Sequence, residues 1–309
     1  SRSTKLILLG AILALSIWGP AVQAGNPGES GMLSLRMGVG AREAAMGETG
    51  VASSHGASAL FWNPANNVFA DFQTELVLQH YNYLSLANQE SAAVAHRVGS
   101  GVLGFVFSGL YWDSLDRRSE ENVGVSEGTF KPYDVSFGAS YAHPIGENFG
   151  VGATVKLVYE KIDLYTDTGI AFDLFVSHKA LVEGLMFGAS ATNMGSDLNL
   201  YGEPFRLPTS FRLGASYIPA VEGFMRRFTF AGEIAFPNDT QEKGHFGIEL
   251  SIVPELMLRG GTRMNYDNQG WTAGAGFRPI ETLSIDYAYE NSKIEGFSDG
   301  NKFSLTLHW

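Results

Sequence analysis

Several residue types and motifs are missing from this sequence, and each absence narrows its function. Cysteine does not occur among the 309 residues, which excludes a disulfide framework and thiolate metal sites. The seven histidines are scattered, and no two of them stand four residues apart as in a helical zinc motif. Lysine and arginine never form a run longer than two, and the formal net charge is -11, which argues against nucleic-acid binding. We therefore expect no enzymatic activity, no cofactor, no bound metal and no nucleic-acid partner.

Long apolar runs are also scarce, and the one exception lies near the N-terminus. Arg2 and Lys5 precede an apolar run from Leu6 to Trp18, and Ala21-Val22-Gln23-Ala24 follows it, with Val22 and Ala24 at the −3 and −1 positions of a cleavage site. A charged segment, an apolar core and a small-residue cleavage site are typical of a signal peptide, which we predict for residues 1–24. The run is shorter than the about 20 apolar residues of a spanning helix. The remaining chain is therefore expected to be exported, either as a soluble protein or into a membrane without helices.

From Asp71 onward the sequence alternates with a period of two. Such alternation is typical of β-strands that have one apolar and one polar face. The pattern predicts an all-β domain over residues 71–309. We expect about fourteen strands, at approximately 73–83, 91–98, 102–111, 132–143, 149–161, 169–178, 185–193, 209–218, 227–236, 244–253, 256–264, 270–277, 282–290 and 301–309.

The connections between these strands alternate between longer and shorter. The longer ones include 112–131 and 194–208, and the shorter ones include 99–101 and 254–255. Long loops at one end and tight turns at the other are typical of an antiparallel transmembrane barrel, whose strands of about 9–11 residues cross the bilayer at a tilt. A secreted β-sandwich or propeller would show the same period with its apolar face turned inward.

Three features favour the membrane barrel. Several apolar faces end in an aromatic residue, as an interfacial girdle requires; these residues are Tyr141, Tyr159, Tyr217, Phe236 and Tyr289. The polar faces are rich in Gly, Ser, Thr and Ala rather than in the Lys and Glu of a solvated surface. By analogy with other barrels, the alternating residues Phe303, Leu305, Leu307 and Trp309 would form the signal that the outer-membrane assembly machinery reads. We therefore predict a β-barrel in contact with the lipid of a bacterial outer membrane.

Residues 25–70 differ from the rest because they lack the two-residue period. The stretch Gly38–Gly50 is rich in small residues, but it lacks the flanking strand and long helix that a phosphate-binding loop requires. Further on, the sequence ALFWNPANNVFA at residues 59–70 places an aromatic pair directly before Asn63-Pro64-Ala65. A proline at this position would break a helix begun at residue 59, so we expect a turn.

The stretch GVGAREAAMGETGVASSHGASALFWNPAN at residues 38–66 resembles the N-terminal region of the PorV/PorQ family of bacterial outer-membrane proteins. More distantly it resembles the FadL-type transporters, whose N-terminal hatch also carries an Asn-Pro-Ala. The resemblance implies a fourteen-stranded barrel with residues 25–70 folded into its lumen as a hatch, or plug. A barrel of that strand number would leave an open interior unless a segment filled it, which supports the same interpretation.

The turn at residues 61–64 is the candidate site within the hatch. Phe61 and Trp62 are expected to pack against the barrel wall or against an apolar ligand. Asn63 is expected to accept backbone hydrogen bonds at the turn that Pro64 fixes. The sequence leaves both packing and ligand binding open for the aromatic pair.

A second candidate set consists of ionisable residues that alternation places on the lumen face. Isolated buried charges are costly, so these residues are expected to pair with one another or to remain hydrated. They would form an ion-pair network between wall and hatch, with Arg36 and Arg42 as the hatch partners, or else line a solute path. The wall residues are Asp134, Lys156, Glu160, Arg212, Glu233, Glu249, Arg259, Arg263, Asp286 and Glu290.

Three functions follow from this organisation as hypotheses. The resemblance to PorV/PorQ proteins implies export or surface attachment of other proteins, as in type IX secretion, through secretion or envelope protein partners. The resemblance to FadL-type proteins implies transport of a hydrophobic small-molecule ligand, with the hatch as site and gate. A purely structural barrel subunit of an envelope assembly is the third.

Overall fold

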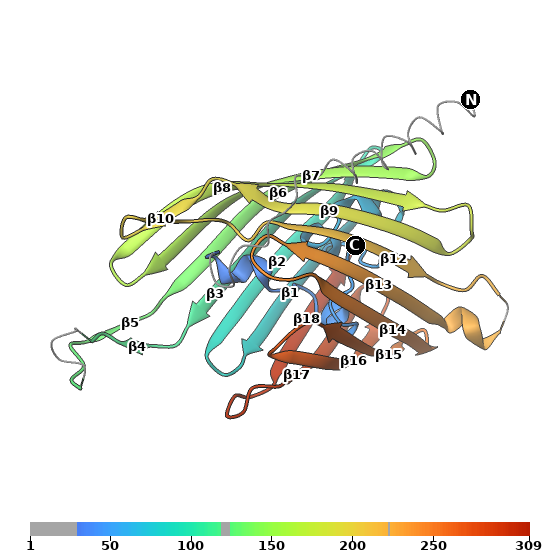
Figure 1. Cartoon of the computed structure of the whole chain (residues 1–309). Helices are drawn as coiled ribbons and strands as arrows, with labels where there is room; N and C mark the ends of the chain where they lie inside the picture. The colour runs from blue at the N-terminus through green and yellow to red at the C-terminus, as the bar shows by residue number, and fades with distance from the viewer. Residues whose placement is uncertain (1–29, 119–123, 222) are drawn as a thin grey trace.

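The computed structural model describes residues 30–118, 124–221 and 223–309, so the predicted signal peptide lies outside the described residues. Its main element is a closed antiparallel barrel of fourteen strands, which confirms the fold class predicted from the two-residue period (Figure 1). The barrel strands are β1 (Thr74–Tyr83), β2 (Ala87–Val98), β3 (Gly101–Trp112), β6 (Tyr133–Ile145), β7 (Phe149–Ile162), β8 (Tyr165–Lys179), β9 (Leu185–Gly195), β12 (Ser210–Tyr217), β13 (Phe228–Pro237), β14 (Lys243–Val253), β15 (Leu256–Met264), β16 (Gln269–Ile280), β17 (Leu283–Ser292) and β18 (Gly300–His308). No helix in the described part of the chain is long and apolar enough to cross a membrane.

The first and last barrel strands pair with each other and close the sheet. In the β1–β18 ladder Leu78 lies opposite Leu305. The ladder continues beyond β18, because Thr74 N–H donates to Trp309 O at 2.9 Å and Trp309 N–H donates to Thr74 O at 3.1 Å. A closed sheet leaves no unpaired strand edge, which is the condition for placing strands in lipid.

The apolar face of the sheet points outward. Phe137, Leu157 and Phe246 are more than half exposed, whereas their chain neighbours Ser136 and His245 are buried on the lumen side. A soluble sandwich would show the reverse, with large apolar side chains inside and polar ones in water. The structure therefore places the apolar band where a bilayer would contact it and the polar groups around an enclosed lumen.

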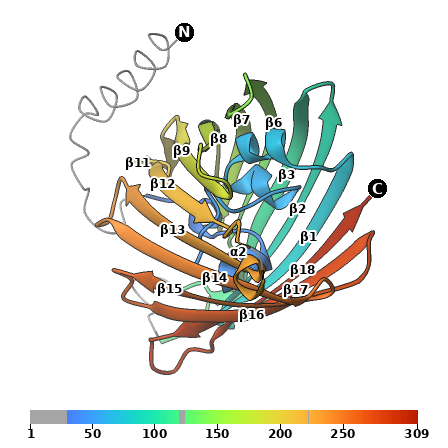
Figure 2. The same ribbon diagram turned by 90° about the vertical axis from the view of Figure 1, so that its right-hand side faces the viewer.

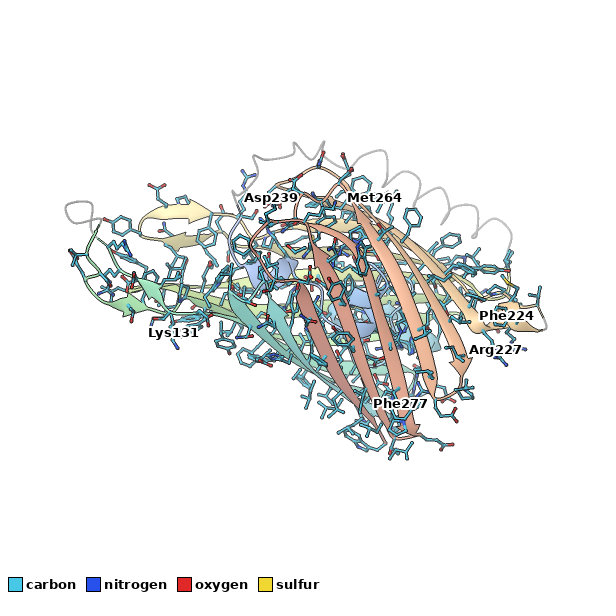
Figure 3. All side chains as sticks on the ribbon, turned by 90° about the horizontal axis from the view of Figure 1, so that it is seen from below. Lys131, Phe224, Arg227, Asp239, Met264 and Phe277 are labelled. Atoms are coloured by element: carbon cyan, nitrogen blue, oxygen red, sulfur yellow. The ribbon has the colours of Figure 1, made fainter. Side chains whose placement is uncertain are left out.

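The two ends of the barrel differ, although less regularly than the sequence suggested. The loop end carries two small hairpins, β4 (Leu115–Asp116) with β5 (Thr129–Phe130) and β10 (Leu198–Leu200) with β11 (Glu203–Phe205), which were not predicted. Tight turns 99–100, 146–148, 254–255 and 281–282 form the opposite, turn end, near Trp309. Strict alternation of loop length does not hold, because 84–86 and 163–164 at the loop end are short and 218–227 at the turn end is long, with the 3-10 helix η4 (Phe224–Arg227). Figure 3 marks both ends, with Lys131, Asp239 and Met264 toward the loops and Phe224, Arg227 and Phe277 toward the turns.

The described part of the hatch, residues 30–70, lies inside the barrel (Figure 2). It contains four short elements: η1 (Leu33–Arg36), α2 (Ala41–Ala45), η2 (Ser58–Phe61) and η3 (Pro64–Phe69). Helix α2 contacts strands β15 to β18, and η3 contacts β6 to β8 on the other side of the lumen. None of the four is long enough to be a stable helix alone, so their conformation depends on contacts with the wall.

Glycine allows the hatch backbone to approach the wall closely. A Cβ at Gly261 of β15 would lie 2.1 Å from the backbone nitrogen of Gly47, and one at Gly247 of β14 would lie 2.3 Å from the carbonyl oxygen of Met46. Any larger residue at these wall positions would push the hatch away. The small residues that resemble the PorV/PorQ motif are therefore matched by small residues on the strands behind them.

Candidate functional site in the barrel lumen

The Asn-Pro turn seats the hatch against the wall. Asn63 is fully buried, and its Oδ1 accepts from the N–H of Ala65 at 3.1 Å, so it caps η3. Its Nδ2 donates to the carbonyl of Val51 at 2.8 Å and lies 3.0 Å from the Ser177 hydroxyl on β8. Pro64 occupies the first turn of η3, where its missing N–H costs no hydrogen bond. The turn therefore joins two hatch segments to one wall strand.

Trp62 lies at the centre of the hatch and is 5% exposed. Its indole N–H donates to the carbonyl of Val39 at 2.6 Å. The ring covers two glycines of the motif, because a Cβ at Gly50 would lie 2.2 Å from it and a Cβ at Gly38 would lie 2.8 Å from it. On the wall side, the Arg212 guanidinium lies 5.1 Å from the ring centroid, within cation–π range. Trp62 therefore holds three separate hatch segments and one wall strand together.

Phe61 packs in a different part of the barrel from Trp62. It is partly buried and packs against a cluster of small and branched residues from the hatch and from β1 to β3, namely Ala57, Leu60, Val77, Ala93, Ala95, Val102 and Val106. Both Phe61 and Trp62 also border a cavity, so the aromatic pair takes part in packing and in the wall of an open space.

An ion-pair chain joins helix α2 to three wall strands. Arg42 contacts Glu249 on β14 at 3.0 Å, Glu249 contacts Arg259 on β15 at 2.6 Å, and Arg259 contacts Asp286 on β17 at 2.6 Å. The last contact passes over β16, and a Cβ at Gly276 of that strand would lie 2.6 Å from the Arg259 guanidinium. A glycine at this point therefore lets an arginine reach a carboxylate two strands away.

A second network surrounds Arg263 of β15. Its guanidinium contacts Glu48 of the hatch at 3.1 Å and Glu290 of β17 at 3.0 Å. Glu290 also contacts Lys302 at 3.0 Å and accepts from the Tyr81 hydroxyl at 2.8 Å. The Lys302 ammonium in turn donates to the carbonyl of Gly38 at 2.8 Å. Glu48, Tyr81 and Lys302 were missed by the sequence prediction; Lys302 does alternate onto the lumen face.

Glu233 of β13 binds the hatch backbone directly. Its Oε2 accepts from the N–H groups of Gly50 and Val51, both at 3.0 Å, and its Oε1 accepts from Arg212 at 2.7 Å. This bidentate use of one carboxylate fixes the turn that carries Gly50 under the Trp62 ring.

The remaining predicted lumen residues lie on the β6 to β9 side. Lys156 of β7 contacts Asp173 of β8 at 2.8 Å. Asp173 in turn accepts from the N–H of Asn193 at 2.7 Å, at a bulge in β9 where Asn193 has a φ of 59°. Asp134 of β6 is 3% exposed and faces Ser34 of the hatch. The structure thus divides the predicted charges among four ion-pair groups and one acidic position, where Asp134 lies opposite Glu160.

Burial and neighbouring charges shift the pKa values of the two ionisable residues of α2, Arg42 and Glu43, in opposite directions. Burial raises the pKa of the Glu43 carboxyl above its usual value, and the nearby Arg42 charge and the Ser58 hydroxyl oppose that rise. Burial lowers the pKa of Arg42, but Glu249 and Glu43 outweigh it and raise the pKa above its usual value. Arg42 therefore stays charged in the closed hatch, while Glu43 is easier to protonate than a solvated carboxyl.

The hatch separates two cavities in the lumen. The loop-side cavity has a volume of about 540 Å³, with Leu60, Phe61 and Trp62 on the hatch and Lys156 and Arg212 on the wall. The turn-side cavity, of about 200 Å³, is lined by charged groups that include Arg42, Glu43, His55, Arg278 and Asp286. The larger cavity thus has an apolar floor, whereas the smaller one is polar.

One motif associated with hydrolases occurs in the chain but lies in the wrong context. Residues 124–128 read Gly-Val-Ser-Glu-Gly, which matches the Gly-x-Ser-x-Gly spacing. Ser126 is exposed in the loop between β4 and β5, where its hydroxyl donates to Asp116 at 3.1 Å. A nucleophile elbow requires a sharp turn from a strand into a helix, so the match carries no catalytic assignment.

Comparisons with known proteins bear on the fold. No protein-family model and no curated protein sequence matches this chain. Among solved structures, the toluene transporter TbuX of Ralstonia pickettii matches with a TM-score of 0.66 and 13% identity, over 90% of this chain and 100% of TbuX. The toluene transporter TodX of Pseudomonas putida matches with a TM-score of 0.66 and 14% identity, over 87% of this chain and 96% of TodX. A FadL homologue of Pseudomonas aeruginosa matches with a TM-score of 0.57 and 12% identity, over 87% of this chain and 97% of that protein.

These likenesses define a class of fold. The chain is a fourteen-stranded outer-membrane-type barrel with the same architecture as the FadL-type transporters. At such low identity the comparison shows the fold alone, and the function is argued below from the lumen.

Proposed function

We propose that this protein lies in a bacterial outer membrane and transports small apolar or amphipathic molecules. The observation that carries the proposal is the loop-side cavity of about 540 Å³ with its aromatic floor on the hatch. Small-molecule sites are typically concave, largely apolar and of this size. A molecule entering from the loop end would meet Phe61 and Trp62 before it reached the turn side. In this proposal the hatch is both the ligand site and the barrier.

The lining of the cavity favours an amphipathic molecule over a pure hydrocarbon. Lys156, Asp173 and Asn193 border it on one side, together with hydroxyl groups of Ser108, Ser136, Thr154, Ser190, Thr192 and Ser210. Most of these groups are satisfied within the protein, but Ser190 Oγ is buried and has no hydrogen-bond partner among the described residues, and a ligand hydroxyl group would supply one, a gain of about 1–3 kcal/mol. An aromatic or aliphatic ligand with one hydroxyl group would place its apolar part on Trp62 and its hydroxyl group toward this side. Two proteins of similar fold are named toluene transporters, which supports an aromatic ligand.

A paired substitution on one strand tests the proposal. Thr192 of β9 lines the cavity, whereas its neighbour Ala191 pairs across the sheet with Leu174 and Phe211 on the outer face. We expect Thr192→Trp to weaken binding of benzyl alcohol to the purified protein at least about tenfold, a loss of about 1.4 kcal/mol. The control Ala191→Trp adds the same side chain on the lipid side and should bind as the original protein does. If both variants bind equally, or if the original protein binds neither benzyl alcohol nor toluene, the loop-side cavity is not the binding site for such molecules.

The sequence resemblance to PorV/PorQ proteins supports a second candidate function. In that proposal the barrel serves export or surface attachment of proteins through secretion partners. It rests on the motif at residues 38–66, which in the structure forms the hatch. Purification from native membranes, followed by mass spectrometry of proteins and lipids, separates the candidates. Stoichiometric secretion proteins would favour export, and a bound apolar small molecule would favour transport. If neither is recovered and benzyl alcohol does not bind, a structural barrel subunit is favoured.

A further inference from the structure

Two carboxylates face each other in the lumen without a basic partner. Asp134 of β6 lies directly opposite Glu160 of β7 in the strand ladder, and both alternate onto the lumen face. Cβ atoms of such cross-strand pairs are about 4.5–5.5 Å apart, and like charges there are destabilising. The other wall carboxylates described above, from Asp173 to Glu290, each contact a lysine or arginine. No ion pair is found for Asp134 or Glu160 among the described residues.

Three oxygen atoms at this point are buried and lack hydrogen bonds. Within the described part of the chain, Asp134 Oδ1, Glu160 Oε2 and Ser34 Oγ have no partner. Asp134 and Ser34 are each only 3% exposed. Ser34 belongs to η1 of the hatch and approaches Asp134 with its hydroxyl and its backbone N–H, and the backbone of Met32 approaches Glu160, so each carboxylate has hatch donors nearby while one of its oxygens stays free. Because nearly all buried polar groups in proteins have a partner, two facing carboxylates that each keep a free buried oxygen indicate a missing one.

We propose that Asp134, Glu160 and Ser34 bind a partly hydrated divalent cation, Mg²⁺ or Ca²⁺. The three donors are all oxygens, which hard cations prefer, and Mg²⁺ is commonly held by one or two carboxylates while it keeps several waters. Ser34 borders the loop-side cavity, as does Ser136, two residues beyond Asp134 on the same face, so the site lies next to that cavity. A cation there would neutralise two facing carboxylates that no side chain neutralises.

The bound cation would fasten the start of the described hatch to strands β6 and β7. Other ties act elsewhere, since Arg36 pairs with Asp239 and Lys302 binds the Gly38 carbonyl. Residues 32–34 have no comparable ionic tie to the wall within the described chain. The cation would therefore complete the attachment of the hatch on its β6–β7 side, whatever molecule the barrel transports.

Mn²⁺ binding followed by electron paramagnetic resonance tests the site on the whole protein in detergent, after chelation. We expect one saturable Mn²⁺ site, displaced by Mg²⁺, with a Kd of about 0.1–1 mM, the range of extracellular oxygen-ligand sites. Asp134→Asn and Glu160→Gln should each weaken Mn²⁺ binding about tenfold or more. Glu147→Gln is the matched control, because Glu147 is an exposed carboxylate in the turn that joins the same two strands at the opposite end. It should bind Mn²⁺ like the original protein.

Hydrogen exchange of residues 31–36 is a second readout, and in the original protein it can be measured even if the variants do not fold. Mg²⁺ should slow exchange there in the original protein, and it should have no such effect in Asp134→Asn or Glu160→Gln, whose folding is checked by heat-modifiable gel migration. Absence of saturable Mn²⁺ binding to the original protein would overturn the proposal, and a shared proton between the two carboxyls would then replace the cation. Unchanged Mn²⁺ binding in both variants would overturn it too. If neither variant folds, the Mg²⁺ effect on the original protein decides.

Discussion

Replacing Trp62 with alanine should release the hatch while leaving the barrel intact. Trp62 is almost fully buried and holds the segments at Gly38 and Gly50 under one ring. It takes no part in the pairing between barrel strands, so the barrel does not depend on it. The substitution would leave a cavity at the centre of the hatch. It would also leave the carbonyl of Val39 without its donor and remove the ring beneath Arg212.

The size of the effect follows from these three losses. Truncating a buried tryptophan costs about 3–5 kcal/mol, an unsatisfied buried carbonyl about 1–3 kcal/mol, and a cation–π contact about 0.5–2 kcal/mol. Because these contributions overlap, we expect about 4–7 kcal/mol of lost hatch stability, or about 10³- to 10⁵-fold less amide protection. The loss cannot exceed the free energy that holds the hatch closed. Trp62→Phe keeps most of the packing and should cost only about 1–3 kcal/mol.

Hydrogen exchange with peptide resolution measures this directly. Exchange should rise across residues 38–69 in Trp62→Ala and remain slow in the barrel strands, and gel migration should remain heat-modifiable. Trp271→Ala is the control, because Trp271 is 52% exposed on the outer face of β16 and should not affect the hatch. Unchanged protection of the hatch in Trp62→Ala would refute the view that this ring holds it together. An intact hatch with lost benzyl alcohol binding would instead make Trp62 a ligand contact.

Three further substitutions test separate contacts. Glu233→Gln should leave Arg212 buried without a counter-charge and loosen the hatch by about 3–5 kcal/mol, seen as faster exchange at residues 49–52; equal exchange would contradict this. Gly261→Ala should place a methyl group against the Gly47 backbone and cost about 1–3 kcal/mol in urea unfolding, with no loss if the hatch can shift freely. The pKa of Glu43 is raised from 4.5, so its contribution to stability is present below that pH and is lost as pH rises through the folded pKa. Glu43→Gln should therefore flatten the pH dependence of the unfolding free energy above pH 4.5, and an unchanged profile would argue against burial of this carboxyl.

The barrel was predictable because a strand between lipid and a polar lumen must alternate apolar and polar side chains. Alternation fixes which residues face the lumen, so Glu233 and Arg212 on neighbouring strands were recognisable as partners. The start of β2 was placed late, at 91 rather than 87, because Asn88 and Glu90 lie on its outer face and interrupt the apolar pattern.

The contacts of the hatch were less accessible to sequence reasoning. A segment without a sequence period does not indicate which of its residues face the wall. Its contact partners also lie far away in the chain, as Arg263 does from Glu48. The reach of Arg259 across β16 to Asp286 depends on one glycine between them, which pairwise alternation does not reveal. The Asn-Pro turn was recognised because its chemistry is local, although the two segments under Trp62, at Gly38 and Gly50, were not.

The uneven distribution of charge around the lumen has a consequence for how a solute would pass the hatch. Ion pairs attach α2 on the β14 to β18 side, whereas η3 is held on the β6 to β8 side mainly by neutral contacts, such as those of Asn63 with Ser177. Separating a buried ion pair costs about 3–5 kcal/mol, but a neutral hydrogen bond contributes only about 1 kcal/mol. The ion pairs therefore act as the hinge of the hatch and the neutral contacts as its latch, and we expect it to open first along β6 to β8 when no cation is bound between Asp134 and Glu160.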